Sequence, residues 1–271
     1  MRHACGWLVL SVLLLQACHG TSIVWVVAQA GDYVVLAADS RTFSVRRQQS
    51  SDHVCKVIAL DRTIFFTSGT ARIELLRGTP WDSLQTAQEI YKATEDHDAQ
   101  ALSIAWGNRT ETWFERQSPS DNQSAMWPNG GLVNGGFINF ASNRDPTVFV
   151  QSLLFNAVTS QISMQTTSYM RGDVGVAGVE VELFTEFTEA KTSRALKAYG
   201  KLKPHGYGRT LSYDRAFVKK AVQFVIDNVS ETDKQFVHRP IDVVVLRRFG
   251  GIDWVARKPN CYSQDLQRPQ K

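Results

Sequence analysis

The feature that most constrains the fold is a pair of apolar runs near the start of the chain, separated by a short polar break. The runs span residues 22–27 and 33–38 and are rich in valine. Gly31 and Asp32 stand between them, and a Gly-Asp pair between two β-branched runs favours a tight turn. The sequence therefore predicts an antiparallel β-hairpin here.

Polar residues flank the predicted hairpin at the end away from its turn. Thr21 opens the first run, while Asp39 and Arg41 follow the second. Because a hairpin returns the chain, we expect Asp39 to come back near Thr21. A hydroxyl, a carboxylate and a guanidinium would then share one end of a sheet.

This stretch resembles the start of a mature proteasome β subunit, which is an N-terminal-nucleophile (Ntn) hydrolase. The resemblance rests on Thr-Ser-Ile-Val at residues 21–24, on Gly31, and on Val-Val-Leu-Ala-Ala-Asp-Ser-Arg at residues 34–41. It continues over Cys-Lys-Val-Ile-Ala-Leu at residues 55–60 and Thr-Ile-Phe-Phe-Thr-Ser-Gly at residues 63–69. Beyond residue 69 only the order of elements is similar.

The resemblance implies a catalytic role for four residues. Thr21 would be the nucleophile, and its free α-amine, which titrates at roughly 7.7–8.0 when unperturbed, would be the base. The ammonium of Lys56 would disfavour the protonated amine, and Asp39 would hold Lys56 and the amine in position. The amide of Gly69 would donate to the oxyanion, an effect worth roughly 3–4 kcal/mol for one good donor.

Other parts of the family pattern match less well. Two additional residues lie between Gly31 and Asp39 relative to the usual β-subunit spacing. The family's Gly-Ser-Gly-Ser loop is absent, and Ser193 is the nearest candidate for its serine. The family's Asp-x-x-Ser-Gly-Gly is reduced to Asp233 without the serine and glycines. Arg41 is a candidate for substrate binding.

Each candidate also has an interpretation without catalysis. Thr21 can be merely the first residue of a strand, and Asp39 and Arg41 can form a structural ion pair. Lys56 can protect an edge strand from aggregation, and Gly69 can simply turn the chain. The signal for a site lies in the order of the four residues, since each one alone is weak.

Residues 1–20 have the layout of a secretory signal peptide. A basic start precedes an apolar core at residues 7–15, which is too short to span a membrane, and a region of small residues follows it. Cleavage after Gly20 would expose Thr21. The sequence around Cys18 also resembles a bacterial lipobox, and lipidation there would leave Thr21 internal. We expect a secreted or periplasmic protein, or alternatively a lipoprotein.

Composition argues against several classes of function. The net charge is only +4 in 271 residues, and no basic run stands out, so no nucleic-acid partner is expected. The six histidines are scattered, no zinc-type cysteine spacing occurs and no phosphate-binding glycine loop is present. We therefore expect neither a metal nor a cofactor. Three glycosylation sequons, at Asn108, Asn122 and Asn228, have meaning only in a eukaryotic host.

Two cysteines, Cys55 and Cys261, lie beyond the predicted signal peptide. Export permits a disulfide between them. Cys55, however, lies in an apolar, strand-like run, where a buried free thiol is the commoner outcome. The sequence leaves the pairing open and favours the free thiol.

The rest of the chain predicts strands, two helices, strands, two helices and strands. Thr79 is expected to cap the first helix and Ser212 the last. The other expected helices cover residues 99–106 and 190–201, and the expected strands cover 54–59, 63–68, 136–140, 147–155, 161–168, 240–246 and 252–255. Residues 42–52 and 117–131 are expected to be loops, and 258–271 a loose polar tail. This order predicts an α+β domain over residues 21–257, and the resemblance narrows it to a four-layer αββα sandwich.

Two functions agree with the sequence. The first is an exported amide hydrolase that acts on a peptide or small amide substrate with Thr21 as nucleophile. The alternative is a non-catalytic binding or structural protein on the same fold, with a lipid anchor at Cys18 as its one membrane contact. In either case we expect a monomer or a small homo-oligomer.

Overall fold

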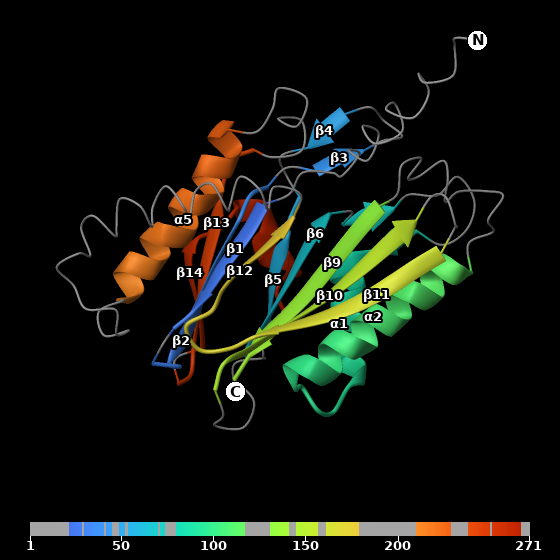
Figure 1. The fold of residues 1–271 in the computed structure, drawn as a ribbon, viewed down its shortest axis with the longest axis horizontal. Coiled ribbons are helices and arrows are strands. Elements are labelled where there is room, and N and C mark those ends of the chain that lie inside the picture. Colours follow the sequence, from blue (N-terminus) through green and yellow to red (C-terminus); the bar gives the residue numbers. More distant parts are fainter. Residues whose placement is uncertain are drawn as a thin grey trace, which may run out of the picture.

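Two five-stranded antiparallel sheets carry the fold, with long helices packed on them (Figure 1). The protein is therefore of the α+β class. The structure is a computed structural model, and it describes residues 22–28, 30–40, 42–44, 49–51, 54–69, 71–73, 80–116, 131–140, 145–156, 161–178, 210–228, 238–249 and 251–266.

The first sheet is built around the predicted hairpin, which is confirmed. Its strand order is β12-β1-β2-β13-β14, with β1 (Ser22–Val27), β2 (Tyr33–Ala38), β12 (Val174–Gly178), β13 (Asp242–Arg247) and β14 (Gly251–Ala256). Ile23 lies opposite Ala38, and Gly31 has a φ of 69° in the connecting turn. Glycine adopts this left-handed conformation without steric cost.

The second sheet has the order β11-β10-β9-β6-β5. Its strands are β5 (Val57–Leu60), β6 (Thr63–Gly69), β9 (Gly131–Asn139), β10 (Thr147–Asn156) and β11 (Gln161–Tyr169). Two short strand pairs lie outside the sheets: β3 (Thr42–Ser44) with β4 (Gln49–Ser51), and β7 (Arg72–Ile73) with β8 (Trp81–Asp82).

The helices divide between the two sheets (Figure 1). The helix α5 (Leu211–Asn228) packs on β1 and β2, whereas α1 (Ser83–Ala93) and α2 (Ala99–Glu115) pack on the second sheet. Asp82 and Asp98 cap α1 and α2 by accepting hydrogen bonds from backbone N–H groups of the first turn.

Successive side chains of a strand point to opposite faces of its sheet, and the apolar side chains therefore form three clusters. In β1, Val24 and Val26 contact α5, while Ile23 and Trp25 pack toward the second sheet. The second sheet likewise presents one face to the other sheet and the opposite face to α1 and α2. Because side chains alternate along a strand and both faces of the first sheet are covered at its centre, β1 and β2 read as continuous apolar runs.

Glycines make room for two aromatic rings in the cluster between the sheets. Trp25 lies opposite Gly175, Phe66 lies opposite Gly136, and the centroids of the two rings are 5.0 Å apart. A Cβ on Gly175 would come within 2.1 Å of the Trp25 ring, and one on Gly136 within 2.2 Å of the Phe66 ring. Each ring therefore occupies the space that a side chain on the neighbouring strand would need.

Several element boundaries differ from the predictions. Asp82, not Thr79, caps the first helix, because Trp81 enters a short strand and buries its ring before the helix begins. The second helix continues to Glu115, and β9 begins at Gly131 instead of Gly136. Residues 42–52, expected to be a loop, contain the β3–β4 pair.

The C-terminal part of the chain also needs correction. The last helix begins at Leu211, and the Thr210 hydroxyl, not that of Ser212, accepts the hydrogen bond from the Tyr213 amide. The tail expected to be loose from Lys258 instead forms the 3-10 helix η2 (Pro259–Gln264) and packs on the body of the protein through residue 266. The predicted helix at 190–201 and the loop at 117–130 lie outside the described residues.

Candidate functional site

A buried ion pair between Asp39 and Lys56 lies where the two sheets meet at one end. The Lys56 Nζ atom donates to both carboxylate oxygens of Asp39, at 2.7 and 2.9 Å. The side chains are 0% and 1% exposed for Asp39 and Lys56. The structure therefore brings together two of the four residues that the sequence placed in one site.

The two residues lie at the ends of strands that belong to different sheets. Asp39 directly follows β2, and Lys56 directly precedes β5. The backbone carbonyl of Lys56 accepts a hydrogen bond of 2.8 Å from the Thr67 amide, which ties the lysine to the neighbouring strand β6. Ser22 starts β1 at this same end of the first sheet, since Ile23 pairs with Ala38.

Burial changes the acidity of the lysine. Desolvation lowers the pKa of Lys56 from 10.5 to about 8, although the negative charge of Asp39 opposes this change. A second ammonium, on Lys258, lowers the pKa of Lys56 further, and the carboxylate of Asp242 raises it. The Lys56 ammonium is thus more acidic than that of an exposed lysine.

A second group of buried charges, missed by the sequence analysis, lies beside the first. The Nζ atom of Lys258 is 3.0 Å from a carboxylate oxygen of Asp242, and the Lys258 amide donates to the other oxygen at 2.9 Å. Asp242 starts β13 opposite Ala38, so it lies one register position from Asp39. The sequence did contain a signal for this group. Asp242 is a lone acidic residue ahead of the apolar run 243–246, and the basic pair Arg257 and Lys258 follows the next strand.

Arg257 extends this group toward the C-terminus. Its guanidinium donates to Asp265 at 2.7 Å, lies 4.0 Å from Asp242 and stacks over the ring of Trp254 at 3.7 Å from the ring centroid. Burial raises the pKa of Asp265, while hydrogen bonding to the Ala59 amide and the charge of Arg257 act in the opposite direction.

Residues 257–266, which we call the C-terminal strap, run along the segment that carries Lys56. Arg257 donates to the Val57 carbonyl at 2.6 Å, and Lys258 donates to the Val54 carbonyl at 2.7 Å. Farther along, the Ala59 amide donates to Asp265, and its carbonyl accepts from the Leu266 amide, both at 2.8 Å. The strap therefore holds both ends of the segment on which Lys56 lies.

A disulfide between Cys55 and Cys261 fastens the strap beside Lys56. The Cα atoms are 5.6 Å apart, and both residues are buried, at 2% and 0% exposure. The preference for a free thiol was wrong, because residues that read as a loose tail bring Cys261 against the start of β5.

Gly69 ends β6 opposite Val133, with a φ of 76°. Polar groups that precede it in β6 are fixed by the next strand: the Ser68 hydroxyl accepts from the Asn134 side chain at 2.9 Å, and the Thr67 hydroxyl donates to the Asn134 carbonyl at 3.0 Å. The left-handed backbone agrees with the interpretation that Gly69 turns the chain, and its role as an oxyanion donor stays a prediction.

The other predicted site residues lie outside the described residues. These are Thr21, Arg41, Ser193 and Asp233. The geometry of the site is therefore that of Asp39 and Lys56 with the neighbouring group around Asp242 and Lys258.

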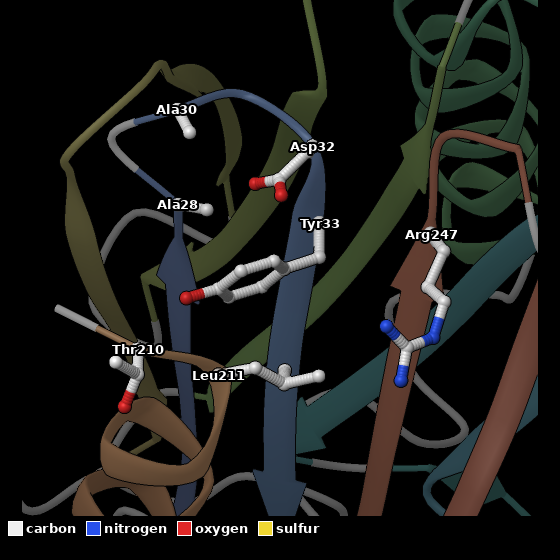
Figure 2. Close-up of a pocket in the computed structure, with 7 residues that line it drawn as sticks. All are labelled: Ala28, Ala30, Asp32, Tyr33, Thr210, Leu211 and Arg247. Carbon is white, nitrogen blue, oxygen red and sulfur yellow. The ribbon is translucent and has the colours of Figure 1, made fainter.

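A separate cavity of about 290 Å³ lies at the opposite end of β2 (Figure 2). Asp32 and Tyr33 line it from the hairpin, Arg247 from the end of β13, and Thr210 and Leu211 from the start of α5. Asp39 lies six residue steps along extended chain from Tyr33, which corresponds to about 20 Å. This cavity consequently has no direct part in chemistry at Asp39 and Lys56.

Within the described part of the chain, no cluster of three or more His, Cys, Asp or Glu side chains has the arrangement of a metal site. Across the same residues, no helix combines the length and apolar character needed to cross a membrane.

Comparison of the chain with models of known protein families found no match, and comparison with curated proteins found none either.

Proposed function

We propose that this protein is an exported Ntn hydrolase of the proteasome β type, which cleaves amide bonds with Thr21 as its nucleophile. The fold proposed with it is the four-layer αββα sandwich. Support for the fold comes from α5 on one sheet, α1 and α2 on the other, and an apolar cluster between the sheets.

The observation that carries the proposal is the buried contact between Asp39 and Lys56 at the end of the hairpin. The resemblance predicts that these two side chains lie together, although Asp39 follows a strand of one sheet and Lys56 precedes a strand of the other. Thr21 is joined by one peptide bond to Ser22, the first residue of β1. The proposed nucleophile is thus attached to the strand whose end lies at the pair.

In the proposed reaction, the Thr21 hydroxyl attacks the carbonyl carbon of an amide. The α-amine of Thr21 takes the hydroxyl proton and then delivers it to the leaving nitrogen, so that an acyl ester on Thr21 remains. Water, deprotonated by the same amine, hydrolyses this ester and regenerates the hydroxyl. Each proton that the amine accepts is returned within the cycle.

Lys56 has an electrostatic role in this scheme. Its ammonium disfavours a second positive charge, so it keeps the Thr21 amine neutral and able to accept a proton. Asp39 keeps the ammonium in place, because a buried lysine without a counter-charge would lose its proton. Activity then requires a charged Lys56 and a neutral amine, which predicts a bell-shaped pH profile whose basic limb reports Lys56.

The alternative is a non-catalytic protein on the same fold, and one observation favours it. Asp39 and Lys56 are almost completely buried, as expected of an ion pair that only joins two sheets. Lipidation at Cys18 would also block the proposed base, because Thr21 would then lack a free amine.

A β-lactone that acylates N-terminal threonine separates the two functions. The protein is first shown by intact mass to begin at Thr21, and the labelled residue is then identified by peptide mapping. We expect labelling at Thr21, none in Thr21→Ala, normal labelling in the neighbouring control Ser22→Ala, and labelling slower by roughly 10²–10⁴-fold in Lys56→Ala. Folded, correctly processed protein that stays unlabelled would make the non-catalytic function the better one.

A further inference from the structure

We propose that Lys258, held by Asp242, is a positioning residue that sets the charge state of Lys56, so that the C-terminal strap controls the candidate site. The inference rests on the proposed function for its catalytic meaning. The electrostatic interactions that it invokes involve only residues that the structure describes. The resemblance offered no counterpart for either residue.

The first argument is the position of the Lys258 side chain. It is 2% exposed, and its Nζ atom reaches back to the Val54 carbonyl, two residues before Lys56. The strap thus inserts an ammonium into the segment that carries the proposed catalytic lysine. The disulfide between Cys55 and Cys261 holds this arrangement from the residue next to Lys56.

The second argument is that the four charged groups form two adjacent pairs. Asp39 follows β2, and Asp242 starts β13 opposite Ala38, so the two carboxylates come from neighbouring strands. Each carboxylate holds one lysine, at 2.7 Å for Lys56 and 3.0 Å for Lys258. Buried charges are poorly screened, and the charges of each pair influence the lysine of the other.

The charges that act on Lys56 come from three elements of the fold. Asp39 at the end of β2 and Asp242 at the start of β13 favour its protonated form, and Lys258 after β14 disfavours it. Lys258 is in turn influenced by Asp39 and Arg257, and burial lowers its pKa. Removal of the charge at Lys258 must therefore raise the pKa of Lys56, and removal of the charge at Asp242 from a chain that already lacks the Lys258 charge must lower it again.

These opposite signs allow a test that does not depend on hydrolysis. The full mature chain is labelled with ¹³Cε-lysine, and the Lys56 resonance, assigned with Lys56→Arg, is followed by NMR as the pH is raised. Lys258→Gln retains a donor for the Val54 carbonyl, and Lys258→Arg retains the charge. Asp242→Asn is made in the Lys258→Gln chain, because alone it would leave the Lys258 ammonium without its counter-charge. We expect the Lys56 midpoint to rise in Lys258→Gln, to fall again when Asp242→Asn is added, and to stay near the wild-type value in Lys258→Arg.

A purely structural role for Lys258 would give a different result. Loosened packing would move the Lys56 midpoint in the same direction in Lys258→Gln and again when Asp242→Asn is added, or would leave it unchanged, and either outcome overturns the proposal. If neither variant folds, the wild-type titration decides. Coupled lysines each show a second inflection at the pH where the other titrates, and two independent single-step curves would refute the coupling.

The same variants separate this inference from the proposed function. In a chain that labels at Thr21, the basic limb of the pH–rate profile should move with the Lys56 midpoint, upward in Lys258→Gln and downward again when Asp242→Asn is added. Labelling at Thr21 with an unmoved Lys56 midpoint would refute the inference and leave the function standing. A moved midpoint in a chain that never labels would refute the function and leave the coupling of the two lysines standing.

Discussion

The disulfide between Cys55 and Cys261 should account for a large share of the stability of this protein. It joins residues 206 apart in sequence, so it restricts nearly the whole unfolded chain. The loop-entropy relation for a loop of this length gives about 5 kcal/mol at 25 °C, and measured losses for native disulfides are typically about 2–5 kcal/mol. We therefore expect removal of the bond to lower the free energy of unfolding by about 2–5 kcal/mol.

The folded state should survive this removal, because other contacts hold the same segments together. Lys258 and Arg257 bind the carbonyls of Val54 and Val57, and the Ala59 amide binds Asp265. Since both cysteines are buried in apolar surroundings, replacement of both by alanine leaves no unpaired polar group. The loss should thus arise chiefly from the greater freedom of the unfolded chain.

The assay is denaturant unfolding of the mature chain and of the variant Cys55→Ala with Cys261→Ala. For a domain of this size, the expected loss corresponds to a fall in melting temperature of roughly 5–15 °C. Alkylation after unfolding without reductant verifies that the wild-type thiols are unavailable, and each single alanine variant serves as a control with one free thiol. A loss below about 1 kcal/mol in the double variant would refute the reasoning, because the strap would then be closed equally well without the bond.

The remaining predictions concern packing, acidity and processing. Gly175→Ala and Gly136→Ala should each lower the free energy of unfolding by roughly 1–3 kcal/mol, measured in urea, because the new methyl group overlaps a buried aromatic ring. The pKa of Lys56 is about 8 in the folded protein and 10.5 unfolded, so the unfolded chain binds more protons between these values and stability should rise with pH across that window. The rise should be about 3 kcal/mol relative to the uncharged variant Asp39→Asn with Lys56→Met, and its absence in calorimetry from pH 7 to 11 would show that the lysine is not desolvated. Intact mass of the exported protein should place the first residue at Thr21, and a lipid on an upstream residue would contradict this.

Local signals in the sequence were enough to predict the core of the fold. The hairpin was predictable because its strands, its turn and its flanking polar residues lie within twenty residues of each other. The contact between Asp39 and Lys56 could not be predicted from local signals, because it joins two sheets and hydrophobic periodicity carries no information on contacts between sheets. The prediction of this contact came from the resemblance. The α+β class followed from the order of elements.

Long-range contacts of polar segments were not predictable in the same way. The strap reads as a loose tail because it lacks an apolar period, and it is held by hydrogen bonds and the disulfide instead. The first half of β9 was hidden by its glycines: Gly135 and Gly136 weaken a strand pattern, yet both are required because the rings of Trp106 and Phe66 occupy the adjacent space.

The ammonium of Lys258 in the C-terminal strap helps to distinguish between the two functions. A buried ion pair costs desolvation and seldom stabilises a protein more than apolar residues of the same size, so the pair of Asp39 and Lys56 is weak evidence for a structural purpose. In either function Lys56 has to carry its charge, and a second ammonium beside it opposes that. Lys258 nevertheless lies there, buried and fixed to the segment of Lys56. A simple link between two sheets gains nothing from this opposition, whereas in the proposed site it makes activity depend on pH, because activity falls where Lys56 loses its proton.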